Sequence, residues 1–261
     1  MLLLDEICEY VVNEVSRRGL EFATVDLCVG LRYTYAVVRS GREEFIGFSY
    51  TPLEDLTHIH QEVSEYADVS LGSVCDLIRS VNPLAKAVAL AYLNAVSATI
   101  TEVPADSLGK DLLDCMKFSS NDVVVFVGYI GPLVRRVSGK VREVYVLERN
   151  PLRRQAALPD TAAPRVLPRA TKVVITGASL VNDTIDQVLG MCRGNAEIAL
   201  VGATASTYPE PLFNAGIRYV AGFRAHREHI SDAVRCVKLA GGTRELYRYG
   251  SKYVLTGSRP G

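Results

Sequence analysis

The chain has 261 residues, of which 48% are hydrophobic and 22% charged, an ordinary composition for a globular protein with a substantial core. Lysine plus arginine and aspartate plus glutamate each number 29, so no net field attracts nucleic acid or a membrane surface, and we expect neither as a partner. The apolar residues 1–4 run directly into Asp5 without the features of a signal peptide. Because no uninterrupted apolar run approaches the ~18 residues of a membrane span, the sequence predicts a cytoplasmic protein.

The six cysteines are scattered and include no C-x-x-C pair. In a chain of this length, such cysteines predict small buried side chains rather than a disulfide framework or a cysteine-rich zinc site. They are Cys8, Cys28, Cys75, Cys115, Cys192 and Cys236.

Residues 1–98 predict a small α+β unit. The strand candidates in this part follow one another so closely that they indicate an antiparallel three-stranded meander. The helix after Asn82-Pro83 is rich in alanine and leucine, which predicts that it is largely buried. The expected elements are a helix at 3–18, strands at 23–29, 33–38 and 44–48, and helices at 72–80 and 83–98.

Residues 99–120 are of mixed character, and we interpret them as a bridge with one short helix at 111–116. From 121 to 261, strand candidates alternate with helices at a spacing that indicates right-handed βαβ units and a parallel sheet. The expected strands are at 123–128, 143–147, 173–175, 197–201, 219–221 and 253–255.

The stretch from Val173 to Thr184 joins a buried strand to a helix whose apolar stripe includes Ile185. A turn between the carboxyl end of a parallel strand and a helix N-terminus is where open α/β sheets bind ligands, and it favours an anion. The alternative is that the polar side chains only cap the helix. The candidate ligand-binding residues here are Thr176, Gly177, Ser179, Asn182 and Thr184.

Two other strand ends carry a similar pattern. Gly128 and Tyr129 begin a partial dinucleotide motif that lacks its third glycine, and Glu148 lies where a ribose-binding acid would follow. A plain tight turn and a solvated glutamate are the alternative. Gly202 and Thr204 repeat the pattern, and we expect another glycine turn at Gly222. Because consecutive strand ends share one edge of a sheet, these turns predict a common pocket.

Two histidine pairs have a spacing compatible with a metal ion, His58-x-His60 and His226-x-x-His229. Neither pair has an adjacent cysteine or an obvious third ligand, so ordinary surface histidines are the alternative. The candidate metal ligands are therefore these four histidines and Glu148.

Several motifs carry a family resemblance that covers nearly the whole chain. They are 29–34, 46–48 and 89–95 in the first unit, and 127–129, Pro132, Glu148, Pro151, 176–184, 201–204, Pro209, 212–213, Gly216 and Gly222 in the second. The chain resembles the putative heavy-metal-chelation family, whose members join an enolase N-terminal-like domain to a Rossmann-like domain. Residues 203–206 depart from the Gly-Pro-Ser/Thr pattern expected there.

The resemblance implies an α/β fold in which a Rossmann-like parallel sheet with helices on both faces follows a smaller enolase N-terminal-like α+β domain. It also implies a cleft between the two domains and a role with a heavy metal or a metal chelate. Without an acid-rich metal barrel, we do not expect an enolase. The expected divisions are 1–98, 99–120 and 121–261.

Three hypotheses about function follow, and the sequence leaves open whether a reaction is catalysed. The first is a protein that binds a small anionic molecule or metal chelate in the interdomain cleft, with a transition or heavy metal as candidate cofactor. Thr34 and Asn94 would reach in from the small domain, although Asn94 could equally satisfy a buried helix contact. Glu148 would be the metal ligand or catalytic base.

The second hypothesis is a group-transfer enzyme that uses a nucleotide-like cofactor such as S-adenosylmethionine between Gly128 and Glu148. The third is a ligand-sensing or scaffold protein without turnover. A homo-oligomer is compatible with each of the three.

Overall fold

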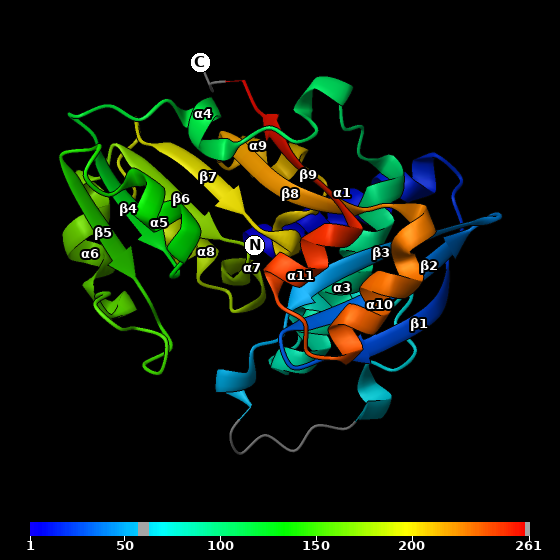
Figure 1. Ribbon diagram of the computed structural model, residues 1–261. Helices are drawn as coiled ribbons and strands as arrows, with labels where there is room; N and C mark the ends of the chain where they lie inside the picture. The colour runs from blue at the N-terminus through cyan, green and yellow to red at the C-terminus, as the bar shows by residue number, and fades with distance from the viewer. Residues whose placement is uncertain (57–62, 259–261) are drawn as a thin grey trace.

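The structure is a computed structural model that describes residues 1–56 and 63–258. Within these residues it contains a three-stranded antiparallel sheet and a six-stranded, mostly parallel sheet, which lie on opposite sides of the molecule in Figure 1. The expected mixed α/β fold is confirmed. The small sheet has the order β1-β2-β3 and the large sheet the order β5-β4-β6-β7-β8-β9.

The small sheet is covered on both faces by helices. Alternation along β2 (Tyr33–Ser40) sends Ala36 into the core around helix α3 and Val37 into a second core with helix α10. Helix α10, from near the end of the chain, therefore packs on the sheet formed near its beginning (Figure 1). The remaining elements of this region are α1 (Leu3–Arg17), β1 (Ala23–Val29), β3 (Glu43–Tyr50), α2 (Val74–Arg79), α3 (Pro83–Ile100), α10 (Ile230–Lys238) and α11 (Thr243–Leu246).

Helix α3 is the central core helix. It begins at Asn82, whose side chain accepts hydrogen bonds from the main-chain N–H groups of Leu84 and Ala85. Strand β3 approaches α3 at Gly47, where a Cβ would lie 2.2 Å from the main-chain oxygen of Ala91. Of the helices described, α3 alone has the length and apolar character of a membrane span, and 78% of it is buried inside the protein.

The large sheet is parallel from β5 to β8, as expected, and only the last strand, β9, runs antiparallel. The expected glycine turn at Gly222 is wrong, because this residue lies inside β8. The ring of Tyr253 on β9 occupies the space beside Gly222, where a Cβ would lie 2.3 Å from the hydroxyl oxygen. The strands are β4 (Val123–Val127), β5 (Glu143–Leu147), β6 (Lys172–Thr176), β7 (Glu197–Val201), β8 (Tyr219–Ala225) and β9 (Gly250–Thr256).

Helices cover both faces of the large sheet, which confirms the expected arrangement. Phe126 of β4 lies in a cluster with residues of α4 and α5, whereas Val125 lies in a cluster with residues of α6 and α8. The helices are α4 (Leu112–Met116), α5 (Gly131–Val137), α6 (Ala163–Val166), α7 (Ala178–Val181), α8 (Ile185–Met191) and α9 (Glu210–Asn214).

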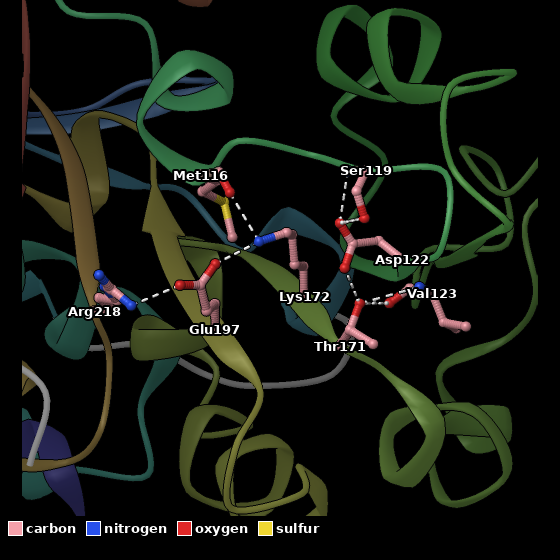
Figure 2. A network of polar contacts seen from close by, with 8 residues as sticks. All are labelled: Met116, Ser119, Asp122, Val123, Thr171, Lys172, Glu197 and Arg218. Atoms are coloured by element: carbon pink, nitrogen blue, oxygen red, sulfur yellow. Dashed lines mark hydrogen bonds and ion pairs between the residues drawn. The ribbon is translucent and has the colours of Figure 1, made fainter.

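Polar contacts link the amino-terminal ends of the central strands of the large sheet (Figure 2). The Lys172 ammonium donates to the main-chain oxygen of Met116 at 2.8 Å and to the Glu197 carboxylate, which also pairs with Arg218 at 2.6 Å. Beside this group, the Thr171 hydroxyl donates to Asp122 at 2.7 Å. Because the Lys172 and Arg218 cations both pair with Glu197 inside the protein, we assign this network a structural role.

The expectation of small buried cysteines rather than disulfides is wrong for one pair. Cys8 on α1 and Cys75 on α2 form a disulfide with a Cα–Cα distance of 5.7 Å. The pair forms because α1 and α2 pack side by side on α3, an adjacency that the spacing of the cysteines does not reveal. Cys28, Cys115, Cys192 and Cys236 are free.

Candidate functional site

The turns after β4, β6 and β7 lie along one edge of the large sheet, because these strands are adjacent and parallel. At each turn the glycine N–H donates to the neighbouring strand. Gly128 donates to the oxygen of Leu147 at 2.8 Å, and Gly177 donates to that of Val201 at 2.8 Å. Gly202 does the same to Ala221 at 3.0 Å. The glycine amides therefore extend the sheet and are not free to bind an anion.

The turn after β6 is filled by its own side chains. The Ser179 hydroxyl donates to the oxygen of Thr176 at 2.8 Å, and the Thr184 hydroxyl donates to Asn182 at 2.7 Å. The expected single helix is divided into α7 and α8, with Asp183 between them at φ 57°. Because α7 has only four residues, its dipole is too small to attract a ligand strongly.

Glu148 closes the turn after β4. Its carboxylate accepts the N–H of Tyr129 at 3.0 Å through Oε2 and the N–H of Asn150 at 2.9 Å through Oε1. The positive φ of Gly128 (92°) lets the chain make this turn, and Tyr129 is 38% exposed. Glu148 and the Gly128–Tyr129 turn are thus brought together, with the carboxylate engaged by the main chain.

The turn after β7 packs against the small sheet. The Thr204 hydroxyl accepts the N–H of Tyr50 at 2.9 Å, and its main-chain oxygen accepts a hydrogen bond from Asn94 at 3.0 Å. Gly177 also lies against this turn, where a Cβ would be 2.7 Å from the nitrogen of Ala205. Thr34 on β2 is buried, and its hydroxyl contacts that of Thr51 at 3.0 Å.

A cavity of about 100 Å³ lies beside this contact, between the two sheets. This is several times the volume that one water molecule requires. Residues of β3, α3, β8 and β9 and the turn after β7 line it. The polar lining includes Glu44, Asn94, Ser206, Arg224, Arg227 and Tyr253.

Arg224 brings an uncompensated positive charge to the cavity. Its guanidinium donates to the main-chain oxygen of Thr101 at 2.8 Å, and within residues 1–56 and 63–258 it has no ion pair. Glu44, which also lines the cavity, pairs with Arg39 at 2.6 Å. Burial lowers the pKa of Arg224 from its usual value. An anion in the cavity would offset the cost of this desolvation by forming an ion pair with the guanidinium.

Asn94 adds an unused acceptor. Its Nδ2 donates to the main-chain oxygens of Phe48 at 2.7 Å and Thr204 at 3.0 Å. Because carbonyl oxygens only accept, these two contacts determine the orientation of the amide. Asn94 is 1% exposed, and its Oδ1 has no hydrogen-bond partner among the described residues. Asn94 therefore combines a place in the cavity wall with a buried acceptor that lacks a donor.

The predicted histidine pairs have different outcomes. His226 and His229 lie together just after β8, and Glu228 supplies a third metal-binding atom within 4.8 Å of theirs. His58 and His60 lie outside the described residues. Sequence reasoning missed Glu228, although it stands between the two histidines, and it missed Arg224, whose signal is a lone charge in an otherwise apolar strand.

Comparison with known proteins gives the family. The model of DUF364, described as putative heavy-metal chelation, matches residues 111–256. The chain belongs to the DUF364 family. A second model, DUF4213, which has the same description, matches residues 13–97. The resemblance inferred from the sequence motifs is confirmed.

Three relatives of this DUF364 protein cover nearly all of its length. It is 28% identical over 258 residues to an uncharacterized protein of Methanocaldococcus jannaschii, covering 97% of this chain and 98% of the relative. A DUF364 crystal structure from Pyrococcus horikoshii, of unknown function, matches with a TM-score of 0.86 and 24% identity over 98% of this chain and 100% of that one. Another, from Desulfitobacterium hafniense, matches with a TM-score of 0.74 and 22% identity over 97% and 98%. These structures support the fold.

Proposed function

We propose that this DUF364 protein binds a small carboxylate that also carries a hydroxyl or amino group, in the cavity between its two sheets. The observation that carries the proposal is that one cavity is lined by both Arg224 and Asn94. Arg224 has no counter-ion among the described residues, and Asn94 Oδ1 has no hydrogen-bond partner there. The carboxylate would pair with Arg224, and the O–H or N–H group would donate to Asn94 Oδ1.

Burial makes both groups favour such a ligand. A charged group that loses water without gaining a counter-ion destabilises the empty protein, and so does an acceptor without a donor. A single small molecule can compensate both, since both side chains line the same cavity. Tyr253 lines the cavity as well; burial raises the pKa of its hydroxyl, and a hydrogen bond with Ser206 opposes that rise.

The family description supports the same class of ligand. Hydroxycarboxylates and amino acids offer adjacent oxygen and nitrogen donors, the arrangement that chelates divalent metals. The cavity would accordingly take such a chelator, either free or carrying its metal. Which of these two forms binds is an outcome of the experiment.

The test is isothermal titration calorimetry with citrate, malate and glycine, each with and without equimolar Zn²⁺. We expect heat of binding from at least one of them. Arg224→Gln should weaken that binding by about 10- to 100-fold, the loss of one charge-assisted hydrogen bond. Arg235→Gln, which changes an exposed arginine on α10, should leave it unchanged.

Three results would reject the proposal. The first is equal affinity in the wild type and the Arg224→Gln variant. The second is that S-adenosylmethionine, titrated in the same way, binds while the carboxylates do not, which would favour the group-transfer hypothesis at the turn between Gly128 and Glu148. The third is an absence of heat with all the carboxylates.

A further inference from the structure

We infer that His226, Glu228 and His229 form a separate site for one divalent transition-metal ion. One ligand atom of each residue lies within 4.8 Å of the other two. This inference does not rest on the carboxylate proposal, because none of the three residues lines the cavity.

The local backbone brings the two imidazoles together. His226 precedes the 3-10 helix η7 (Arg227–His229), and His229 is its last residue. A 3-10 helix has about three residues per turn, so residues three apart lie on one face. The ring centroids of the two histidines are 6.2 Å apart. The hydrogen bond from the His226 N–H to the oxygen of Tyr249, at 2.9 Å, ties this turn to the chain before β9.

Neighbouring side chains orient each ring and leave one nitrogen for a metal. Nδ1 of His229 contacts Oδ2 of Asp232 at 3.1 Å, and Nε2 of His226 contacts the Ser251 hydroxyl at 2.8 Å. Metal-binding histidines commonly use their second nitrogen in such contacts, which hold the tautomer and the ring orientation. Nε2 of His229 and Nδ1 of His226 remain available as ligands.

The charges near the cluster favour a cation. Glu228 and Asp232 contribute two carboxylates, and neither forms an ion pair with lysine or arginine among the described residues. The adjacent Arg227 is engaged elsewhere, since it pairs with Glu43 and lies 4.8 Å from the ring centroid of Phe45. The arginine therefore has its own counter-ion and aromatic partner.

The ligand types indicate which metal binds. Two imidazoles and one carboxylate suit Zn²⁺, Ni²⁺ or Cu²⁺ and are poor ligands for Ca²⁺ or Mg²⁺. His226 and Glu228 are exposed, so the remaining coordination positions would be open to water or to a small ligand. We expect a readily exchanging site on the protein surface.

The test is calorimetric titration of the full chain with zinc chloride in a buffer free of carboxylates. We expect one ion per chain, and weakening by about tenfold or more in each of His226→Gln, Glu228→Gln and His229→Gln. Asp232→Asn, which changes a positioning residue, should weaken binding by a smaller factor. Unfolding midpoints should stay unchanged, because His226 and Glu228 are exposed and His229 is only partly buried.

The matched control for Glu228→Gln is Glu21→Gln, which changes an exposed glutamate outside the cluster and should bind zinc as the wild type does. The absorption spectrum of the Co²⁺ form gives a second readout, because its visible bands report the coordinating nitrogen and oxygen atoms directly. The inference is overturned if the cluster variants bind zinc like the wild type. It is equally overturned if only the control loses the ion, or if the wild type binds none.

Discussion

Asn94 of helix α3 donates a hydrogen bond of 3.0 Å to the main-chain oxygen of Thr204 in the turn after β7. The same amide nitrogen donates to Phe48 of the small sheet at 2.7 Å. One side chain thus links α3, the small sheet and the large sheet, while its oxygen has no hydrogen-bond partner among the described residues. Asn94 thus has a structural role through Nδ2, whereas the proposed ligand contact involves Oδ1.

Asn94→Asp should lower the free energy of unfolding by about 3 kcal/mol, because it replaces the donor with an acceptor facing two buried carbonyl oxygens. Urea unfolding followed by circular dichroism measures this change. Asn195→Asp, at an exposed position, should shift stability by no more than about 0.5 kcal/mol. Equal stability of the two variants would mean that Asn94 does not hold the sheets together.

Gly47→Ala should destabilise the protein by about 3 kcal/mol or more, because the new Cβ would lie 2.2 Å from both the oxygen of Ala91 and the nitrogen of Ala95. Helix α3 would have to move away from β3 to accept it. Gly190→Ala in α8 meets nothing within 4 Å and should be neutral or slightly stabilising. Thermal unfolding of both variants checks the prediction, and a neutral Gly47→Ala would contradict the close packing.

The ion pair of Lys86 with Asp183 links α3 to the turn before α8. Lys86 is 9% exposed at its side chain, so Asp183→Asn should lower stability by about 3 kcal/mol by leaving a buried cation without its partner. Asparagine suits the positive φ at this position. Adding Lys86→Met should recover most of the lost stability, as measured by chemical denaturation. If stability is not recovered, the loss comes from the backbone conformation at position 183 and not from the unpaired Lys86 cation.

Asp122, shown in Figure 2, predicts a pH dependence of stability. Burial raises its pKa, but the bonds from Thr171 and Ser119 more than offset this, and the folded-state pKa is lowered. The resulting stabilisation is present above the unfolded-state pKa and is lost as pH falls through the folded-state pKa.

Asp122→Asn should therefore cost about 2 kcal/mol at neutral pH and progressively less as the solution is acidified through the carboxylate range. Guanidinium unfolding at a series of pH values measures the difference between the two proteins. A difference that does not change with pH would show that the Asp122 charge contributes no stability.

The alternation of strands and helices allowed much of the fold to be predicted from the sequence. Runs such as Val123–Val127 indicated buried parallel strands, and the closely spaced strands near the N-terminus indicated a meander. Local pattern could not reveal that β8 continues through Gly222, because the space beside that glycine is filled by Tyr253 from another strand.

The candidate site was harder to predict for the same reason. Asn94 was singled out by sequence and lines the cavity, but Arg224 has no neighbouring motif that would mark it as a binding residue. The glycine and hydroxyl residues at the strand ends stood out in the sequence, but such residues are also common in turns for structural reasons. Ser179 is an example, because its hydroxyl donates to the main-chain oxygen of Thr176 within the turn. The disulfide between Cys8 and Cys75 also depends on helix packing that sequence spacing does not encode.

The central claim is that the cavity beside Asn94 and Arg224 binds a small carboxylate. A crystal structure of the protein grown with the tightest-binding carboxylate tests it most directly. We expect the ligand's carboxylate within hydrogen-bond distance of the Arg224 guanidinium and its hydroxyl or amino group on Asn94 Oδ1. A cavity filled by water alone, with the carboxylate bound at the turn beside Glu148 or elsewhere on the surface, would contradict the account.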